Sequence, residues 1–374
     1  MKFIKTILIF TAVAFIGCKN IHNNITDSKS LKFYVGTYTN KTADSHSEGI
    51  YQYQLNKNGT IDSLSLVAKT ESPTFLTKSF DGKYIIASNS KKEGTITSFL
   101  IQKDRLKEIS VSKVDNDPCY VTINKNNYIL TANYGSGTTN LHQIDENGVL
   151  TKTLDTQQNK MNAPSKHPRQ EKAHTHSCYF EPNSTNVISI DLGANKLIFG
   201  TIDSDFNKIV PNEFSELEMP AEAGPRILTF HPTKPWIYVV NELAATVTFI
   251  KKNVTNNSYK IVQTVETLAN EDKPGNTSAH IEITNDGKFV YITNRGHDSV
   301  GVLKVLDSGK LELIQTISTH GKHPRNFALS PDNKFLLVAN RDTNNICSFK
   351  RNHKTGKLTF VSDVKAPKPV CILF

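Results

Sequence analysis

The stretch Pro331–Asn340, PDNKFLLVAN, joins a turn-forming segment to an apolar run that ends in asparagine. Asp and Asn tolerate the positive φ of a tight hairpin, and the aromatic and branched residues that follow favour a strand. The same ten-residue pattern occurs five more times: FDGKYIIASN (80–89), NKNNYILTAN (124–133), PNSTNVISID (182–191), PTKPWIYVVN (232–241) and NDGKFVYITN (285–294). The repeat spacing runs from 44 residues (Asn89 to Asn133) to 58 residues (Asn133 to Asp191). That range is typical of propeller blades rather than of helical solenoids.

Each repeat is expected to contribute four short strands. The turn separates a first strand from a second, and a third and a fourth follow, for example residues 246–251 and 260–267. A seventh repeat is split between the chain ends: residues 33–37 and 49–55 match a second and a third strand, and residues 369–374, PVCILF, match a first strand. The sequence therefore predicts an all-β, seven-bladed β-propeller over residues 31–374, with its ring closed by the C-terminal strand in the N-terminal blade.

The first 18 residues, MKFIKTILIFTAVAFIGC, resemble a bacterial lipoprotein signal. Two lysines precede an apolar run that is too short to span a bilayer comfortably, and small Gly17 stands directly before Cys18. We expect residues 1–18 to be a signal, Cys18 to be lipidated and residues 19–30 to be a flexible tether. The protein would then be exported and held at the cell envelope through its lipid anchor alone. A simple signal peptide cut elsewhere, with Cys18 discarded, is the alternative.

Composition argues against several classes of function. The 44 basic and 35 acidic residues give a net charge of +9, which suits a small anionic substrate, and no basic run with interleaved aromatics indicates nucleic acid. Beyond Cys18 the cysteines are Cys119, Cys178, Cys347 and Cys371. None forms a C-x-x-C pair, and we expect all of them to be small core residues. Neither a metal nor another cofactor is expected, and no obligate protein partner is indicated.

The strand order predicts where the polar residues meet. The start of a first strand and the end of a second strand lie on the same face of the ring, because the two strands run antiparallel. Six residues before each turn stand Thr74, Pro118, His176, Arg226, Ala279 and Arg325. One residue after each second strand stand Ser90, Tyr134, Leu192, Glu242, Arg295 and Arg341. With His174, His280 and His323 near the same level, charged side chains are predicted to gather at one mouth of the central channel.

Such a mouth could bind an anion and move a proton. Arginine offers a fixed fork of donors for a carboxylate or a phosphate, and a histidine or Glu242 could deprotonate a water. The histidine-rich segment His167–Phe180, HPRQEKAHTHSCYF, adds Arg169 to this region. The alternative interpretation is that these residues form ion pairs that join adjacent blades.

Several segments follow one another in a familiar order: RQEKAHTHS, GPRILTFHP, YVVNE, YITNRGHDS, HPRNFALSPDNKFLLVANRD and the terminal KPVCILF. Together they resemble the lactonase family of seven-bladed propellers, which includes the bacterial propeller-type 6-phosphogluconolactonases and, more distantly, the fungal carboxy-muconate lactonizing enzyme. The resemblance extends from about residue 33 to the C-terminus. It implies an active-site set of one His, two Arg and one Glu. By motif these are His174 or His176, Arg226, Glu242 and Arg295.

The residues and the resemblance together give a candidate site. We predict catalytic roles for His176, Glu242, Arg226 and Arg295 and substrate-binding roles for His174, Arg169, Arg325 and His280. His280 marks a departure, because in SAHIEIT it replaces the acidic residue that the family usually has before the first strand of the fifth repeat.

The expected reaction is the opening of a sugar lactone by an activated water, as in a 6-phosphogluconolactonase, with the small-molecule lactone as the partner. An exported enzyme would meet an unphosphorylated sugar lactone more readily than the phosphorylated one that is made in the cytosol. No G-x-S-x-G motif indicates a serine nucleophile. A non-catalytic propeller that binds a ligand or a polysaccharide, and a cycloisomerase that forms a lactone, are the alternatives.

Overall fold

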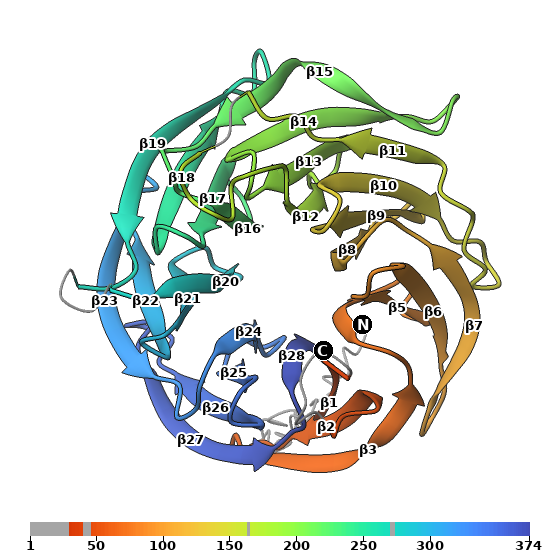
Figure 1. Ribbon diagram of the computed structural model, residues 1–374. Coiled ribbons are helices and arrows are strands. Elements are labelled where there is room, and N and C mark those ends of the chain that lie inside the picture. The colour runs from red at the N-terminus through yellow and green to blue at the C-terminus, as the bar shows by residue number, and fades with distance from the viewer. Residues whose placement is uncertain (1–29, 40–45, 163–164, 270–273) are drawn as a thin grey trace, which may run out of the picture.

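The computed structural model describes residues 30–39, 46–162, 165–269 and 274–374. These residues form seven four-stranded antiparallel sheets that stand around a common axis (Figure 1). The prediction of an all-β, seven-bladed propeller is therefore confirmed. The predicted signal, Cys18 and all of the predicted tether except Ser30 lie outside the described residues. No candidate membrane-spanning helix occurs in the described part of the chain.

The blades are numbered from the N-terminus, and the strands of each blade are given from the axis outwards. Blade 1 contains β28 (Pro369–Leu373), β1 (Leu31–Thr37), β2 (Gly49–Leu55) and β3 (Ile61–Lys69). Blades 2 and 3 contain β4 (Pro73–Lys78), β5 (Tyr84–Asn89), β6 (Thr95–Ile101), β7 (Leu106–Lys113), and β8 (Pro118–Ile123), β9 (Tyr128–Asn133), β10 (Thr138–Gln143), β11 (Asp155–Gln158).

Blades 4 and 5 contain β12 (Thr175–Phe180), β13 (Asn186–Asp191), β14 (Lys196–Asp203), β15 (Lys208–Glu218), and β16 (Pro225–Phe230), β17 (Trp236–Asn241), β18 (Thr246–Lys252), β19 (Tyr259–Glu266). Blades 6 and 7 contain β20 (Thr277–Ile283), β21 (Phe289–Arg295), β22 (Ser299–Val305), β23 (Leu311–Ser318), and β24 (Pro324–Leu329), β25 (Phe335–Asn340), β26 (Asn345–Arg351), β27 (Leu358–Lys365). The repeated turn thus joins the first and second strands of blades 2 to 7, as the sequence predicts.

β28 closes the ring by pairing antiparallel with β1, so that the two ends of the chain share blade 1 (Figure 1). Val35 and Ile372 are register partners and lie with Phe33 in one buried cluster. Lys78 Nζ in blade 2 donates a hydrogen bond of 2.8 Å to the backbone oxygen of Phe374. The C-terminal strand therefore covers the inner edge of β1 and joins blade 1 to blade 2.

The turn and strand-end residues have the conformations that the sequence predicts. Four of the turns contain a residue of positive φ at the expected place: Gly82 (73°), Asn127 (63°), Gly287 (71°) and Asn333 (55°). The asparagines that end second strands hold their own blade together. Asn133 Nδ2, for example, donates to Thr138 Oγ1 at 3.1 Å and to Asn140 Oδ1 at 2.8 Å. A structural role for this repeated asparagine follows.

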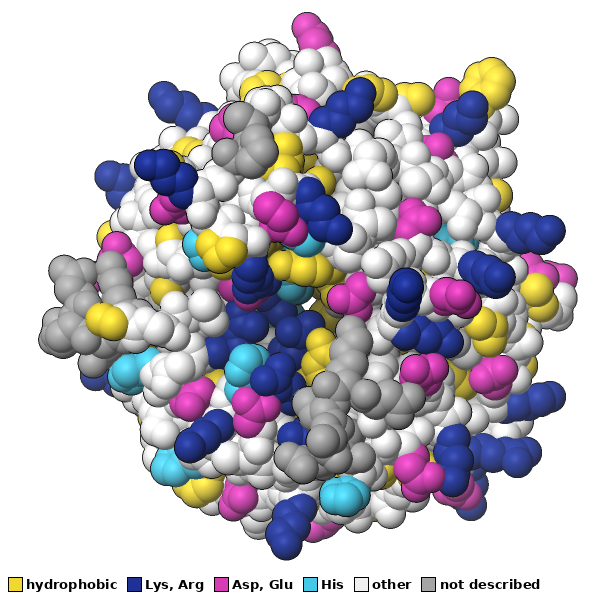
Figure 2. Space-filling view, in the orientation of Figure 1, with side chains coloured by type: hydrophobic (Ala, Val, Ile, Leu, Met, Phe, Trp, Pro, Cys, Tyr) yellow, Lys and Arg dark blue, Asp and Glu magenta, His cyan; other side chains and the backbone are white. Residues whose placement is uncertain are grey.

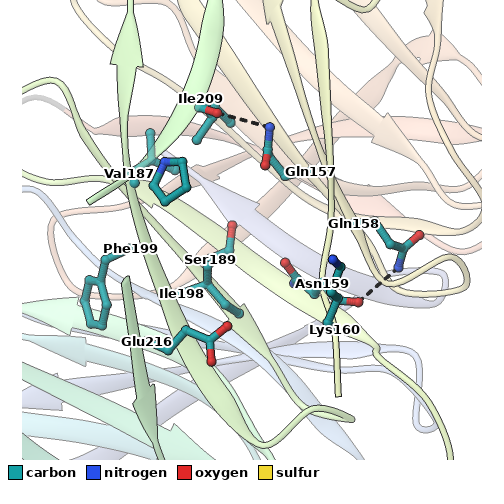
Figure 3. A pocket seen from close by; sticks show the side chains of 12 residues that line it. Gln157, Gln158, Asn159, Lys160, Val187, Ser189, Ile198, Phe199, Ile209 and Glu216 are labelled. Atoms are coloured by element: carbon teal, nitrogen blue, oxygen red, sulfur yellow. Dashed lines mark hydrogen bonds between the residues drawn. The ribbon is translucent and has the colours of Figure 1, made fainter. Parts of the chain in front are cut away.

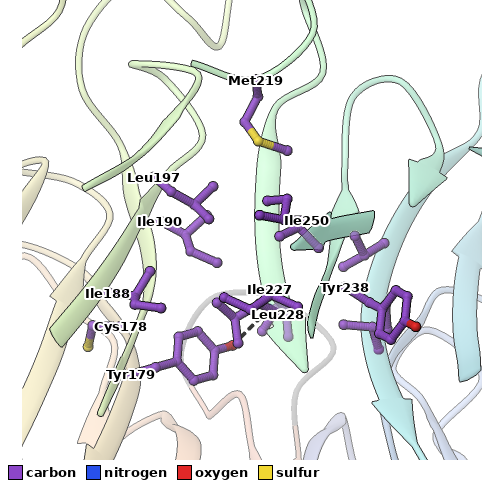
Figure 4. Packing of buried hydrophobic residues seen from close by; sticks show 14 of the residues in the cluster. Cys178, Tyr179, Ile188, Ile190, Leu197, Met219, Ile227, Leu228, Tyr238 and Ile250 are labelled. Carbon is purple, nitrogen blue, oxygen red and sulfur yellow. Dashed lines mark hydrogen bonds between the residues drawn. The ribbon is translucent and has the colours of Figure 1, made fainter. Parts of the chain in front are cut away.

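The core lies between neighbouring blades. Figure 4 shows Ile188, Ile190 and Leu197 of blade 4 facing Ile227 and Ile250 of blade 5. Each of these side chains is at most 3% exposed, and burial of a large aliphatic side chain stabilises the fold by about 1.5–3 kcal/mol. Most of the hydrophobic stabilisation therefore comes from the contacts between blades.

A recurrent contact, which we call the glycine joint, also links blades. A glycine of positive φ in the turn between the third and fourth strands lies against an aromatic ring of the preceding blade, and a Cβ on it would overlap that ring. The pairs are Gly59 with Phe335, Gly148 with Tyr84, Gly309 with Phe249 and Gly356 with Phe289. In each pair the glycine carbonyl also accepts a hydrogen bond from a hydroxyl of the preceding blade: Ser348 (2.6 Å), Ser98 (2.6 Å), Tyr238 (2.9 Å) and Tyr291 (2.6 Å).

Candidate active site

A β-bulge near the start of each innermost strand supplies the inner wall of the site. In all seven blades the pairing between the first and second strands skips one or two residues there. A bulged residue is left out of the ladder and its side chain is re-aimed. The skipped residues are Val370, Thr74, Cys119, His176, Arg226, Ala279 with His280, and Arg325. All of them except Ala279 line one narrow void of about 10 Å³ on the axis.

The bulges correct two of the predicted positions. Counting six residues back from the turn gives Pro118 in blade 3, but the residue in the void is Cys119. The reason is a turn that is one residue shorter: Asn124 N bonds to Tyr128 O, whereas Ser79 N bonds to Tyr84 O in blade 2. In blade 6 the count gives Ala279, but the bulge there holds two residues and His280 is the one that lines the void. Cys119 is therefore buried, as predicted, but it also forms part of the site wall.

A wider cavity of about 230 Å³ opens above this void on the face where first strands begin and second strands end. Figure 2 shows basic side chains gathered in the central hollow of this face. The cavity is lined by Tyr38, Ser90, Asp117, Cys119, Tyr134, Arg169, His176, Glu242, Arg295, His323, Arg325 and Arg341. The predicted convergence of charged residues at one mouth is therefore present in the structure.

Glu242 lies at the centre of the site and is held by three arginines. It follows β17 directly and is 2% exposed. Arg226 Nε lies 2.7 Å from Oε2, Arg295 Nη2 lies 2.8 Å from Oε1, and Arg169 Nη1 contacts Oε1 as well. Arg226 and Arg295 also donate to the backbone oxygens of Ala279 and Ser278 in blade 6. The cluster consequently joins blades 5 and 6, so the predicted site and the alternative of blade-joining ion pairs share the same residues.

The charges around the cluster determine the protonation states of Glu242 and His176. Burial raises the pKa of Glu242, but Arg295, Arg226 and Arg169 lower it further, and the net pKa lies well below the ordinary value. Burial, followed by the charge of Arg226, holds the pKa of His176 well below its ordinary value. An ionised carboxylate therefore faces a neutral imidazole.

His176 and Glu242 face each other across a short gap. His176 Nε2 lies 3.8 Å from Glu242 Oε2, which is longer than a direct hydrogen bond. Glu242 Oε2 accepts no hydrogen bond from any described residue, despite its ion pair with Arg226, and the buried Nε of Arg295 likewise donates none. An acceptor and a donor are thus available beside the imidazole.

The loop between β11 and β12 brings Arg169 to the mouth from outside the repeat. Arg169 Nε and Nη2 donate to Tyr134 Oη at 3.0 and 2.9 Å. The His174 ring stacks on Tyr134 with centroids 4.4 Å apart. Its Nδ1 lies 2.9 Å from the backbone oxygen of Tyr134, and its Nε2 lies 3.0 Å from Glu171 Oε1. His174 does not line the cavity, whereas Tyr134 does. Of the two histidines of the HTH motif, His176 is the one that reaches the site.

The opposite side of the mouth is more strongly basic. Arg325 lies over the ring of Tyr38, with 5.4 Å between the guanidinium carbon and the ring centroid. His323 Nδ1 lies 3.6 Å from Asp342 Oδ2. Burial, with Arg295 and Arg341 nearby, lowers the pKa of His323 to about 3. Cations outnumber anions on this side, which favours a ligand with negative charge or many oxygen atoms.

The sequence interpretation missed two wall residues, Tyr38 and Asp117. Tyr38 follows β1 directly and so is the blade 1 equivalent of Tyr134 and Glu242; extending the count to the split blade would have found it. Asp117 has a φ of 54°, which is uncommon for a residue other than glycine, and stands directly before the Pro118 that opens β8. An Asp-Pro pair at the start of a first strand is the signal that could have found it.

Three other cavities lie between blades or at the opposite face rather than at the mouth. Figure 3 shows one of about 140 Å³, with Gln157 and Lys160 on one side and Val187, Phe199 and Glu216 on the other. The others, of about 320 and 270 Å³, are lined around Trp236 and around Phe335. The volume of a cavity does not identify the functional site here. The mouth cavity is smaller than two of the others, but it is the one that holds the buried Glu242 cluster.

Fold and site together define a seven-bladed propeller with an arginine-bound carboxylate and a neutral histidine at one mouth. The chain belongs to the lactonase family of such propellers, since residues 32–374 match the family described as "Lactonase, 7-bladed beta-propeller". Family membership supports lactone hydrolysis as its general activity.

Relatives agree with this assignment. The chain is 33% identical to the 6-phosphogluconolactonase of Bacillus subtilis (strain 168), over 91% of this chain and 97% of that one. A candidate 6-phosphogluconolactonase from Bacteroides fragilis is 30% identical, with a TM-score of 0.84 and coverage of 93% and 98%. A Lactobacillus plantarum protein is also 30% identical, with a TM-score of 0.86 and coverage of 92% and 99%.

Proposed function

We propose that the protein hydrolyses a sugar lactone at the mouth, with His176 as the general base. The observation that carries this proposal is the pairing of a neutral His176 with the ionised, hydrogen-bond-free Oε2 of Glu242, 3.8 Å away. A water that contacts both atoms from the cavity side would give its proton to the imidazole, and the resulting imidazolium would lie beside the carboxylate. Glu242 is too strongly paired with arginines to be the better base.

In the proposed reaction the water oxygen bonds to the lactone carbonyl carbon while its proton moves to His176. The carbonyl oxygen becomes an oxyanion, which the free Nε–H of Arg295 is available to bind, and Arg226 holds Glu242 in place. The ring C–O bond then breaks, and the leaving oxygen takes the proton from His176. The product is the open hydroxy acid, and His176 returns to its neutral form.

The proposed substrate contacts come from the basic part of the wall. Arg325 and Arg169 would hold the ring hydroxyls or an anionic substituent, and His280 lines the void beneath. His174 would act indirectly by holding Tyr134. The named relative supports a sugar lactone as the substrate class. If the N-terminal segment is a lipoprotein signal with Cys18 as its lipidated residue, the enzyme lies at the cell envelope, and we propose an unphosphorylated sugar lactone there.

Hydrolysis of glucono-δ-lactone, its 6-phosphate and a muconolactone tests the proposal. We expect turnover of a sugar lactone well above the buffer rate and a loss of about 100-fold or more in His176→Ala, because the base is gone. Arg105→Ala, a change of an exposed residue in the turn before β7, is the control and should leave turnover unchanged.

Rates equal to buffer on every lactone, together with measurable binding, would favour a non-catalytic propeller. Formation of a lactone from the open acid would instead favour a cycloisomerase.

A further inference from the structure

Cys119 differs from the other three described cysteines in where its sulfur lies. It is a bulged residue that lines both the mouth cavity and the void beneath it. Cys178, Cys347 and Cys371 are at most 1% exposed and belong to the packed clusters between blades. Burial raises the pKa of Cys347 and of Cys371 to about 12, so these thiols stay protonated and unreactive.

The sulfur of Cys119 has groups around it that act in opposite directions. Its Sγ donates a hydrogen bond of 3.2 Å to the backbone oxygen of His176, which favours the protonated thiol, and it lies 3.9 Å from Nδ1 of the same residue. Arg226 and Arg325 line the void with it. Burial is the largest influence on the pKa of each arginine, but a negative charge on Cys119 raises the pKa of both. The two guanidinium groups that share the void with the sulfur oppose this hydrogen bond and favour the thiolate, which is the nucleophilic form.

The void beside the sulfur has room and a donor for one added oxygen atom. Its volume of about 10 Å³ is close to that occupied by a single water molecule. Thr74 Oγ1, on its wall, is buried and makes no hydrogen bond with any described residue. A buried donor without a partner is costly, and an oxygen bonded to Sγ would supply the missing acceptor.

We propose that Cys119 is a peroxide-sensitive thiol whose oxidation switches the site off. The thiolate sulfur attacks one oxygen of hydrogen peroxide, the O–O bond breaks, and the products are the sulfenic acid of Cys119 and hydroxide. The sulfur is oxidised and the peroxide is reduced, so the step needs no further reagent. The new oxygen occupies the void and accepts a hydrogen bond from Thr74. Among the described residues no second thiol lines the void, so the sulfenic acid is not converted to a disulfide there.

Oxidation would change the chemistry of the mouth directly. The sulfenic acid gives its proton to the released hydroxide, and the resulting sulfenate places a negative charge beside His176 and close to Arg226, which holds Glu242. It also fills the floor of the cavity. We expect turnover to fall as Cys119 is oxidised and to return when a thiol reductant restores it; this consequence rests on the proposed lactonase activity.

The first experiment needs no substrate. The full-length protein is treated with hydrogen peroxide and then with dimedone, which captures sulfenic acids, and peptide mass mapping locates the adduct, so Cys18 is scored separately. We expect Cys119 to be labelled at least about tenfold faster than Cys178, Cys347 or Cys371. In Thr74→Val, which replaces the hydroxyl with a methyl group of similar size, labelling of Cys119 should persist but at a lower yield. Labelling of Cys119 no faster than that of the three buried cysteines would overturn the proposal.

The second experiment follows turnover in wild type and in Cys119→Ser under the same treatment. Wild type should lose activity in step with dimedone labelling and recover it with dithiothreitol, whereas Cys119→Ser should be resistant. Parallel loss in Cys119→Ser would refute the switch. If no lactone is turned over at all, the proposed function fails, but the labelling result still decides whether Cys119 is the sensitive thiol.

Discussion

At the residue scale, one carboxylate organises the site. Glu242 receives cationic side chains from three different segments: the β11–β12 loop, β16 and the end of β21. Removal of one partner from a buried ion cluster leaves uncompensated charge, which costs more than the pair contributes. The same residue therefore affects both stability and the proposed chemistry.

Glu242→Gln should weaken both properties. The arginines lose their anion, so we expect the free energy of unfolding to fall by about 3–5 kcal/mol, and His176 loses the charge that stabilises its protonated form, so turnover should fall about 100-fold or more. Urea unfolding gives the first quantity, and initial rates per folded molecule give the second. Glu213→Gln, which changes an exposed carboxylate on β15, is the control. It should change the free energy of unfolding by no more than about 0.5 kcal/mol and leave turnover as it is in wild type.

A second buried histidine should make the fold sensitive to acid. His142 on β10 is fully buried, and burial lowers its pKa to about 4, against an ordinary value of 6.5. Between these pH values the unfolded chain binds a proton that the folded chain does not, so stability falls as the pH falls from 6.5 towards 4 and is unaffected by this group above 6.5. The loss amounts to at most about 3 kcal/mol.

In His142→Gln the free energy of unfolding should fall less between pH 7 and pH 4 than it does in wild type. Urea unfolding at several pH values measures this slope, which does not depend on how much the substitution costs at pH 7. His297→Gln, at an exposed position, should leave the profile as it is in wild type. An equally steep acid loss in His142→Gln would show that other groups cause it.

At the scale of the element, the second strands were the easiest part to predict. The turn and the terminal asparagine mark both ends of β5, β9, β17 and β25, and Asp191 takes the place of the asparagine in β13. The turn residues act through local φ preferences. The bulges were harder, because nothing local in a Pro-Cys or Pro-Arg pair shows that a residue leaves the ladder. Arg169 was predicted only from its unusual segment, since its contact with Glu242 joins residues that are far apart in the chain.

The glycine joint gives a test of element packing with an internal control. Gly59 and Gly82 both have positive φ, but a Cβ on Gly59 would overlap the Phe335 ring, whereas a Cβ on Gly82 would meet nothing within 4 Å. Gly82→Ala should cost about 1 kcal/mol from backbone strain alone, and Gly59→Ala should cost a further 1–3 kcal/mol or so from the overlap. Chemical denaturation of the two variants measures the difference.

A double variant tests whether the overlap causes the extra cost. Phe335→Leu, combined with Gly59→Ala, makes room for the new Cβ and should recover part of the lost free energy of unfolding. Equal costs for the two glycine variants would show that the joint is not tightly packed.

At the scale of the whole molecule, ring closure depends on a single short strand. β28 contributes Val370, Cys371 and Ile372, which are 2%, 1% and 6% exposed. The sequence predicted this closure because an apolar segment at a chain end needs a partner. It could not show that Val370 is also the blade 1 member of the ring of bulged residues.

Deletion of residues 369–374 should open the ring. We expect a loss of about 5 kcal/mol or more from the burial given up, and association through the uncovered edge of β1. Thermal unfolding and size-exclusion chromatography measure the two effects. Deletion of Phe374 alone keeps the pairing of β28 with β1 and should cost much less; a monomeric, equally stable 1–368 chain would contradict closure by this strand.

The seven bulges bear on how such a protein can change during evolution. Each bulged residue stands outside the hydrogen-bonded ladder, so its side chain can be exchanged with little effect on strand pairing. The seven blades therefore place seven exchangeable side chains around one axis, and a change at one of them has to fit its neighbours, because they share one void. A new activity could arise from changes at Thr74, Cys119, His280 or Val370 while the scaffold and the Glu242 cluster are inherited intact.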